Sequence, residues 1–153
     1  MIISQQYTLF DKITVKAKRT MPFEHRKEVD LSSCNTLGLP SVCQYLGRFQ
    51  SANDLQHAFE FAQKEHVPCF VMGGGSNILL PEYLPGVVLI SSDASIHVNG
   101  DEVTVGAGAS WDNLVAETLK MGLFGLENLS SIPGTVGAAP IQNIGAYGVE
   151  LDR

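Results

Sequence analysis

The stretch CFVMGGGSNILL, residues 69–80, decides how this chain folds and where its function lies. An apolar run at 69–72 ends in three consecutive glycines, which are followed by Ser76 and Asn77. A buried strand that breaks into glycines leaves its backbone open to close approach by a ligand or by another segment. We therefore expect a strand and then a loop whose backbone N–H groups and two polar side chains are available for binding.

Length and composition describe a globular protein of one domain, or of one domain with a small lobe. The chain has 153 residues, of which 44% are hydrophobic and 17% are charged, a balance that supports a packed core. The formal net charge of −6 argues against a nucleic-acid partner, because such binding depends on clustered Lys and Arg. No apolar run approaches the roughly 20 residues that cross a bilayer, so we expect no membrane partner.

The cysteines, the histidines and the N-terminal sequence predict a cytoplasmic protein without a metal site. The N-terminal sequence lacks the basic start and apolar core that are typical of a signal peptide. Cys34, Cys43 and Cys69 include no CxxC pair, which favours a reducing compartment and gives no zinc-ligand pattern. The four histidines have no metal-ligand spacing either.

Hydrophobic periodicity predicts an α+β protein in which helices and strands are interleaved around one mixed sheet. An amphipathic helix covers residues 54–66, and either Ser51 or Asn53 can cap it. A second helix, capped by Ser110, covers residues 111–121 and stops at a glycine. Strands are expected at 7–19, 44–49, 69–72 and 86–90, and a hairpin around an Asn-Gly turn is expected at 95–98 and 102–105.

The glycines at 73–75 match neither of the common nucleotide-binding fingerprints. A P-loop requires a Lys after its last glycine, and none follows here. A dinucleotide fingerprint requires a third glycine where Ile78 stands, and the following ILLP is more typical of a strand than of a helix start. GAGAS at 106–110 fails in the same way, because Trp111 takes the place of the glycine. What remains is a nest of backbone N–H groups, which suits a pyrophosphate without any cation.

A second segment rich in small residues, GLENLSSIPGTVGAAPIQNIGAYGVE, covers residues 125–150. It is too apolar for a linker. Its glycines and alanines either pack against the sheet or let a ligand approach the backbone, and the upstream glycine loop favours the ligand. We expect Trp111 in the core, Cys69 as a small buried residue and Tyr147 near a site. For Glu127 and the Asn after it, a turn or cap is as good an interpretation as a ligand contact.

Four segments carry a resemblance to a known family. NTLGL at 35–39, GGGSNILL at 73–80, VGAGASWDNLV at 105–115 and the segment at 125–150 occur in this order. Together they resemble the N-terminal, FAD-binding part of the UDP-N-acetylenolpyruvoylglucosamine reductase (UDP-N-acetylmuramate dehydrogenase) family, from residue 31 to the end. GGGSN alone indicates only the wider group of vanillyl-alcohol-oxidase-like flavoproteins, and IPGTVGAAPIQNIGAYG narrows the resemblance to the reductases.

The resemblance implies a truncated two-lobe FAD-binding fold of the vanillyl-alcohol-oxidase-like type, which is an α+β fold. Residues 1–30 are an unassigned N-terminal extension. Residues 31–85 are expected to form a small βαβ lobe with the glycine loop, and residues 86–153 a second, incomplete α+β lobe. The family's substrate-binding domain has no counterpart in this sequence.

The resemblance also implies that FAD binds non-covalently and which residues hold it. The pyrophosphate is expected on Gly73, Gly74, Gly75, Ser76 and Asn77. The ADP and ribityl portion is expected on Ser131, Ile132, Pro133, Gly134, Gly137 and Ala138. The flavin end is expected near Gln142, Asn143, Ile144, Gly145, Ala146 and Tyr147.

The activity that the resemblance implies is an NADPH-dependent reduction of a UDP-sugar enolpyruvate to UDP-N-acetylmuramate. This step belongs to peptidoglycan synthesis, and so to cell-wall biogenesis, cell shape and cell division. The family's catalytic Arg, Glu and Ser lie in motifs that this sequence does not contain, so we assign no catalytic residue and expect the chain alone to be inactive. Two other interpretations stay open: a stand-alone FAD-binding or electron-transfer module, and a non-enzymatic scaffold in which the glycines only pack.

Overall fold

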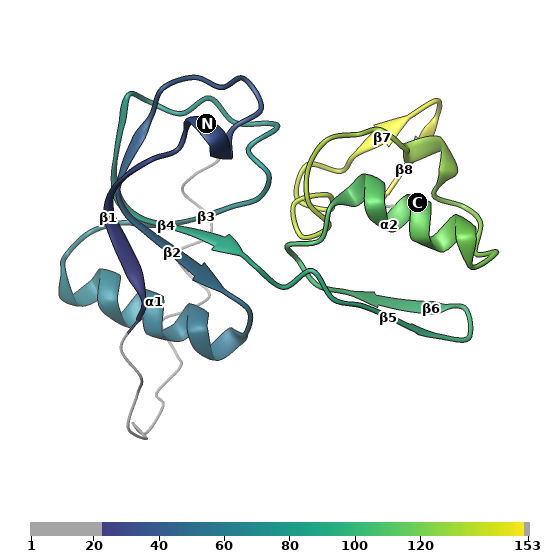
Figure 1. Ribbon diagram of the computed structural model, residues 1–153, viewed down its shortest axis with the longest axis horizontal. Coiled ribbons are helices and arrows are strands. Elements are labelled where there is room, and N and C mark those ends of the chain that lie inside the picture. Colours follow the sequence, from purple (N-terminus) through teal and green to yellow (C-terminus); the bar gives the residue numbers. More distant parts are fainter. Residues whose placement is uncertain (1–22, 152–153) are drawn as a thin grey trace.

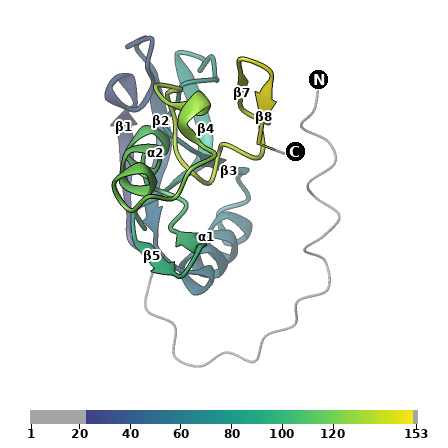
Figure 2. The same ribbon diagram turned by 90° about the vertical axis from the view of Figure 1, so that its right-hand side faces the viewer.

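The computed structural model describes residues 23–151, which form two lobes joined by one stretch of chain (Figure 1). Seen along the long axis, the second lobe lies in front of the first and overlaps its outline (Figure 2). In the described part, no helix is long and apolar enough to cross a membrane. The strand expected at 7–19 lies outside the described residues. The elements in chain order are β1 (His25–Asp30), η2 (Ser32–Cys34), β2 (Val42–Phe49), α1 (Ala52–Lys64), β3 (Cys69–Met72), β4 (Tyr83–Ser91), β5 (Ile96–Asn99), β6 (Glu102–Val105), α2 (Trp111–Lys120), η3 (Glu127–Leu129), β7 (Gly145–Ala146) and β8 (Val149–Glu150).

The first lobe is built on a four-stranded mixed sheet in the order β1-β2-β4-β3. β4 runs parallel to both β2 and β3, and β1 is antiparallel to β2. The apolar run of β4 buries Val87 and Leu89 in one cluster and Val88 in another, as expected of a central parallel strand that is covered on both faces. The strands predicted at 44–49, 69–72 and 86–90 are therefore confirmed.

The edge strand β1 has no counterpart in the sequence-based prediction. All six residues of HRKEVD are exposed or half-buried, so the hydrophobic pattern carries no strand signal there. Pairing with β2, for example between Val29 and Cys43, makes the strand. Residues 25–30 therefore belong to the sheet of the first lobe, and not to a separate extension.

β4 also crosses the lobe boundary expected between residues 85 and 86. The strand runs from Tyr83 to Ser91, and it pairs with β2 and β3 on either side. The first lobe therefore extends to Ser91. The sequence pattern indicates that a strand is present, but it does not say which strands are its neighbours.

Helix α1 covers one face of the first sheet (Figure 1). The Ser51 hydroxyl accepts a hydrogen bond from the Asp54 N–H at 3.2 Å, and the Asp54 carboxylate accepts one from the Ser51 N–H at 3.0 Å. This is a capping box, and it confirms the predicted helix with Ser51, and not Asn53, as its N-cap. Ala58 and Ala62 are buried against the sheet.

The second lobe packs α2 onto a core of its own. Ser110 caps the helix by accepting a hydrogen bond from the Asn113 N–H at 3.4 Å, and Gly122 follows its end with φ +75. Trp111 is only 3% exposed, and its Nε1 donates to the Leu129 carbonyl at 2.8 Å, so it is a core residue as predicted. The hairpin β5–β6 forms as expected, with Gly100 of the Asn-Gly turn in the left-handed region. It is a two-stranded sheet of its own, as is β7–β8, so the prediction of one mixed sheet is wrong. The buried residues of this core are Trp111, Leu114, Val115, Leu129, Ala139 and Ile144.

The ILLP segment that follows the first glycines is not a strand. Residues 78–81 belong to no helix or strand, and Leu79 is 75% exposed. A short apolar run forms a strand only where a neighbouring strand can pair with it. The strand-like composition of ILLP therefore produces no strand, and no helix starts there either.

Replacing Ser51 by Ala removes the oxygen that caps α1, so we expect the free energy of unfolding to fall by about 1 kcal/mol. The matched control is Asn53→Ala, because Asn53 is exposed and takes no part in the capping box. Its effect is expected to stay within about 0.5 kcal/mol. Urea unfolding followed by circular dichroism measures both, and equal losses from the two variants would contradict the assignment of the cap.

Candidate glycine-rich nucleotide site

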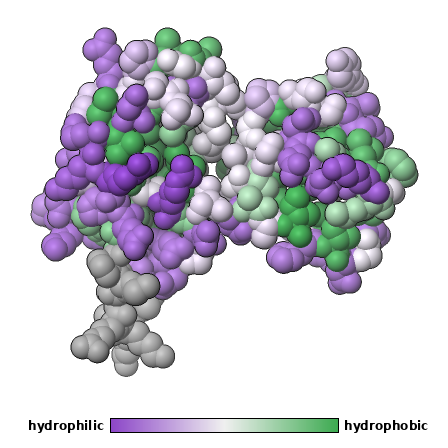
Figure 3. Space-filling model, viewed as in Figure 1, coloured by the Kyte–Doolittle hydropathy of each residue, from purple (hydrophilic) through white to green (hydrophobic). Residues whose placement is uncertain are grey.

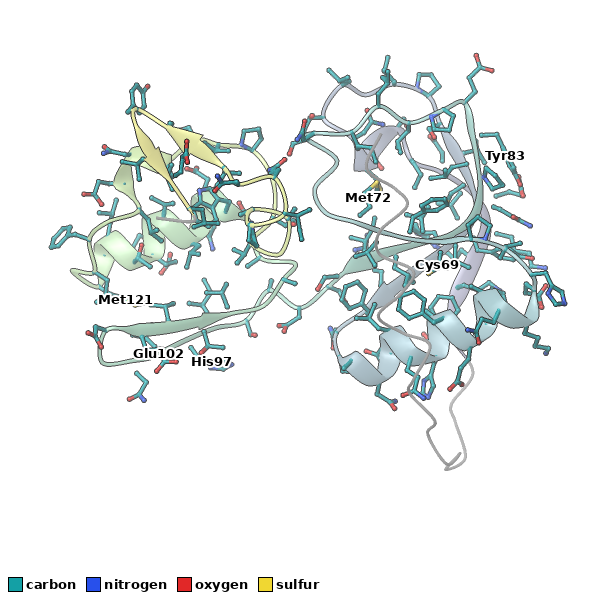
Figure 4. All side chains as sticks on the ribbon, turned by 180° about the vertical axis from the view of Figure 1, so that it is seen from behind. Cys69, Met72, Tyr83, His97, Glu102 and Met121 are labelled. Atoms are coloured by element: carbon teal, nitrogen blue, oxygen red, sulfur yellow. The ribbon has the colours of Figure 1, made fainter. Side chains whose placement is uncertain are left out.

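The first glycine loop, residues 73–77, begins where β3 ends. Met72, the last residue of β3, is buried, and it lies on the side of the first lobe that faces the second lobe (Figure 4). Gly75 has φ +68, and a side chain there would collide with the backbone of Cys34 and come within 2.7 Å of the Asn35 Cα. Only glycine fits this position, because it tolerates both the left-handed conformation and the close contact.

The loop presents backbone donors that no described group uses. Within residues 23–151, the N–H groups of Gly73, Gly74 and Asn77 donate no hydrogen bond, and the last two residues are exposed. Unpaired N–H groups beside a left-handed glycine are typical of the concave backbone nests that bind anions. The arrangement agrees with the predicted pyrophosphate loop.

The second glycine segment, residues 131–147, is held in place by the GAGAS turn that precedes α2. The Trp111 N–H donates to the Gly134 carbonyl at 3.1 Å, and the Gly137 N–H donates to the Ala107 carbonyl at 2.9 Å. A methyl group added at Gly137 would come within 2.7 Å of the Ala107 Cβ. Gly137 is therefore required for packing between these two segments, whether or not a ligand is bound.

The two glycine segments touch each other across the lobes. The Ser76 hydroxyl donates to the Pro133 carbonyl at 3.0 Å. A methyl group at Gly73 would come within 2.7 Å of the Ala138 Cβ, and one at Gly74 within 3.3 Å of the Gly134 Cα. Figure 3 shows residues of near-neutral hydropathy over this junction, as expected where small residues gather. The structure therefore brings together segments that are about sixty residues apart in the sequence.

The residues expected at the flavin end divide into buried and exposed ones. Ile144 is 6% exposed and packs in the core of the second lobe, so only its backbone can face a ligand. Gln142 approaches the junction, since its Nε2 lies 3.8 Å from the position of a Cβ on Gly134. Tyr147 is 92% exposed. Which of these residues contact a flavin stays a prediction.

Unusual backbone conformations gather in the second glycine segment. Among the described residues, five that are not glycine have φ in the left-handed region. Three of these, Ser131, Asn143 and Tyr147, lie within residues 131–147. Such conformations cost free energy and are concentrated at ligand sites, so they support a binding role for this segment.

Both glycine segments are free of charge. Residues 69–80 and 130–148 contain no Asp, Glu, His, Lys or Arg. The Ser131 N–H, one of the expected ligand donors, instead donates to the Asp112 carboxylate at 2.6 Å. Any anion bound here is held by backbone N–H groups and neutral side chains.

Neighbouring groups have structural roles. Glu127 accepts a hydrogen bond from the Gly125 N–H at 2.6 Å, which favours the turn interpretation. Hydrogen bonds from its own backbone and from that of Gly125 lower the pKa of the Glu127 carboxyl. Cys69, at the start of β3 (Figure 4), is half-buried and not fully buried as predicted. It packs against the core cluster that contains Ala58 and Ala62 of α1, and burial raises the pKa of its thiol to about 11.

Two residues that sequence reasoning did not assign to the site also contact the first glycine loop. Thr135 places its Oγ1 2.9 Å from the position of a Cβ on Gly73. Thr36 donates from its backbone N–H to the Gly75 carbonyl at 3.2 Å. Thr135 lies between two expected ligand residues, Gly134 and Gly137, and this position in the sequence could have indicated that it belongs to the site. The contact of Thr36 spans thirty-nine residues; the NTLGL segment carries part of the family resemblance, but its sequence does not show that it contacts the glycine loop.

Contacting glycine loops with unpaired N–H groups are typical of anion and nucleotide sites, and comparison with known families identifies the class of the chain. The model of the FAD binding domain family matches residues 44–152. The chain belongs to this family.

The relatives within this class are reductases. The UDP-N-acetylenolpyruvoylglucosamine reductase of Alcanivorax borkumensis is 46% identical over 139 residues, which are 88% of this chain and 40% of that protein. The corresponding reductase of Escherichia coli is 42% identical over 127 residues, 80% of this chain and 37% of that protein. The crystal structure of UDP-N-acetylenolpyruvylglucosamine reductase from Thermus caldophilus has a TM-score of 0.67 and 31% identity, and covers 83% of this chain and 44% of that one. The chain thus spans about two fifths of the length of the relatives it matches, and it is similar to their FAD-binding part.

Gly75→Ala and Gly74→Ala test the packing of the first glycine loop without any ligand. Gly75→Ala forces a side chain into the left-handed region and against the backbone of Cys34, so we expect a loss of about 2 kcal/mol or more in the free energy of unfolding. Gly74→Ala places its methyl group 3.3 Å from the nearest atom and is expected to cost less than about 1 kcal/mol. Urea unfolding measures both, and equal costs would contradict the described loop.

Proposed function

We propose that this chain is the FAD-binding part of an NADPH-dependent reductase that converts UDP-N-acetylglucosamine enolpyruvate to UDP-N-acetylmuramate. The names of the relatives, at 40–46% identity, support the reaction. The family match supports the cofactor. The proposal includes the peptidoglycan pathway and a cytoplasmic location, as the cysteine content predicts.

The contact between the two glycine segments is the observation that carries this proposal. It leaves a surface where Gly74 and Asn77 are exposed and their N–H groups donate to no described group. A Cβ at Gly74 would point at Gly134 and would fill the space between the segments. These features fit a pyrophosphate that approaches the backbone, as FAD requires.

In this proposal, the residues of this chain bind FAD and orient it. The N–H groups of residues 73–77 hold the pyrophosphate, and the segment 131–138 lines the adjoining part of the cofactor. Residues 142–147 face the flavin end, with Ile144 contributing backbone only because its side chain is buried. When bound, FAD supplies hydride transfer from NADPH to the enolpyruvyl double bond. The acid that delivers the proton is not among the residues assigned here.

Titration with FAD tests the proposal directly. We expect quenching of FAD fluorescence at a 1:1 ratio by the 153-residue chain, and competition by ADP, which shares the pyrophosphate. Quenching that ADP does not relieve would contradict the pyrophosphate site. Absence of binding would favour a scaffold in which the glycines only pack.

Gly74→Val is expected to weaken FAD binding at least tenfold, because its branched side chain occupies the space between the two glycine segments. Gly74→Ala is the graded control, and its FAD affinity is expected to fall less than that of Gly74→Val. The φ of Gly74 lies outside the left-handed region, so neither variant strains the backbone there. Each lobe has its own core and is expected to keep its fold even where valine pushes the two segments apart, which circular dichroism and thermal melting check. Unchanged FAD affinity in Gly74→Val would overturn the assignment of residues 73–77.

A further inference from the structure

We infer that the turn formed by residues 35–38 holds the first glycine loop in its binding conformation, with Thr36 as the positioning residue. This inference rests on the proposed FAD site, but it concerns residues that do not touch the cofactor in that proposal. It is argued from one carbonyl group, that of Gly75, and from the groups that surround it.

Thr36 directs both of its donors at the Gly75 carbonyl. Its backbone N–H lies 3.2 Å from the oxygen, and its hydroxyl lies 3.4 Å from the same oxygen. Gly75 is buried, so this oxygen depends on the turn for its hydrogen bonds. An unpaired buried carbonyl would be costly, which fixes the orientation of the peptide group.

That orientation determines where the next N–H points. The peptide bond is planar and trans, so the Ser76 N–H lies in the same plane as the Gly75 carbonyl and points in the opposite direction. Because the Gly75 carbonyl points toward Thr36, the Ser76 N–H points away from residues 35–38. The Ser76 hydroxyl meanwhile reaches Pro133 in the second glycine segment. Thr36 thus aims a backbone donor without contacting the ligand.

The turn is rigid independently of the glycine loop. Asn35 is 8% exposed, and its Nδ2 donates to the carbonyls of Leu31 and Leu39 at 3.0 Å each. Its Oδ1 accepts from the Leu39 N–H at 3.0 Å. The Gly38 N–H closes the turn on the Asn35 carbonyl at 3.1 Å, with Gly38 at φ +63. A fixed turn can impose a conformation on the flexible glycines that pack against it.

Thr36→Pro removes both donors and places a ring carbon where the N–H faced the Gly75 carbonyl, 3.2 Å from the nitrogen, so the carbonyl has to turn away while the turn itself accepts proline. Position 36 is the second residue of the β-turn, where proline is favoured. Asn35 has φ −133 and ψ 142, the extended conformation that a residue before proline requires. We expect the FAD affinity of Thr36→Pro to fall at least tenfold, while its affinity for riboflavin, which lacks the pyrophosphate, stays close to that of the original chain. Its melting temperature is expected to fall by a few degrees, because the buried Gly75 carbonyl loses its donors.

Thr36→Ser is the matched control, because it keeps the N–H and the hydroxyl, and its FAD affinity is expected to stay within threefold. Unchanged FAD binding by Thr36→Pro, or an equal loss of FAD and riboflavin, would overturn the inference. If Thr36→Pro does not fold, Thr36→Val tests the inference, because it keeps the N–H and lacks the hydroxyl. Its affinity for FAD is expected to fall two- to threefold, and its affinity for riboflavin is expected to stay unchanged. An unchanged ratio of FAD to riboflavin affinity in Thr36→Val would then overturn the inference. Failure of the original chain to bind FAD is a different result, which overturns the proposed function itself.

Discussion

The approach of two glycine-rich segments from different lobes is the constraint on which this structure depends. Gly73 lies against Ala138 and Gly74 against Gly134, at distances that leave no room for longer side chains. One hydrogen bond, from the Ser76 hydroxyl to the Pro133 carbonyl, connects the same segments. Packing without side chains gains little from hydrophobic burial. Each lobe therefore relies on its own core, and the junction is left with exposed backbone groups instead of apolar ones.

This junction explains how an acidic protein can offer a site to an anion. The formal net charge is −6, yet residues 69–80 and 130–148 carry no charge of either sign. Backbone N–H groups supply positive partial charge without a titratable group, so their ability to donate does not change with pH. The carboxylate of Asp112, which contacts the second glycine segment, is hydrogen bonded to the Ser131 N–H. A cofactor with a pyrophosphate suits such a surface better than a ligand that requires an ion pair.

The sequence predicted those parts that depend on local pattern. The 3.6-residue stripe and the caps located α1 and α2, the Asn-Gly turn located the hairpin, and the apolar runs located β2, β3 and β4. It missed β1, because a polar edge strand is made by its neighbour and has no periodicity of its own. The sequence-based lobe boundary fell inside β4, because the residues of a strand do not show which other strands pair with it. In the site, motifs located both glycine segments but could not tell that Gly137 packs on Ala107 or that Ile144 faces the core.

Binding and proton transfer need different side chains, and this difference limits what the described site can do. Backbone amides and small neutral residues can hold and orient a pyrophosphate, but a backbone amide is not a general acid near neutral pH. Neither glycine segment contains an Asp, Glu, His or Lys, the groups that general acid catalysis most often uses. Relatives of this chain are about two and a half times as long as the part it matches. In the proposed reductase, the two glycine segments therefore hold the cofactor, and no carboxylate, imidazole or ammonium group of these segments serves as the acid.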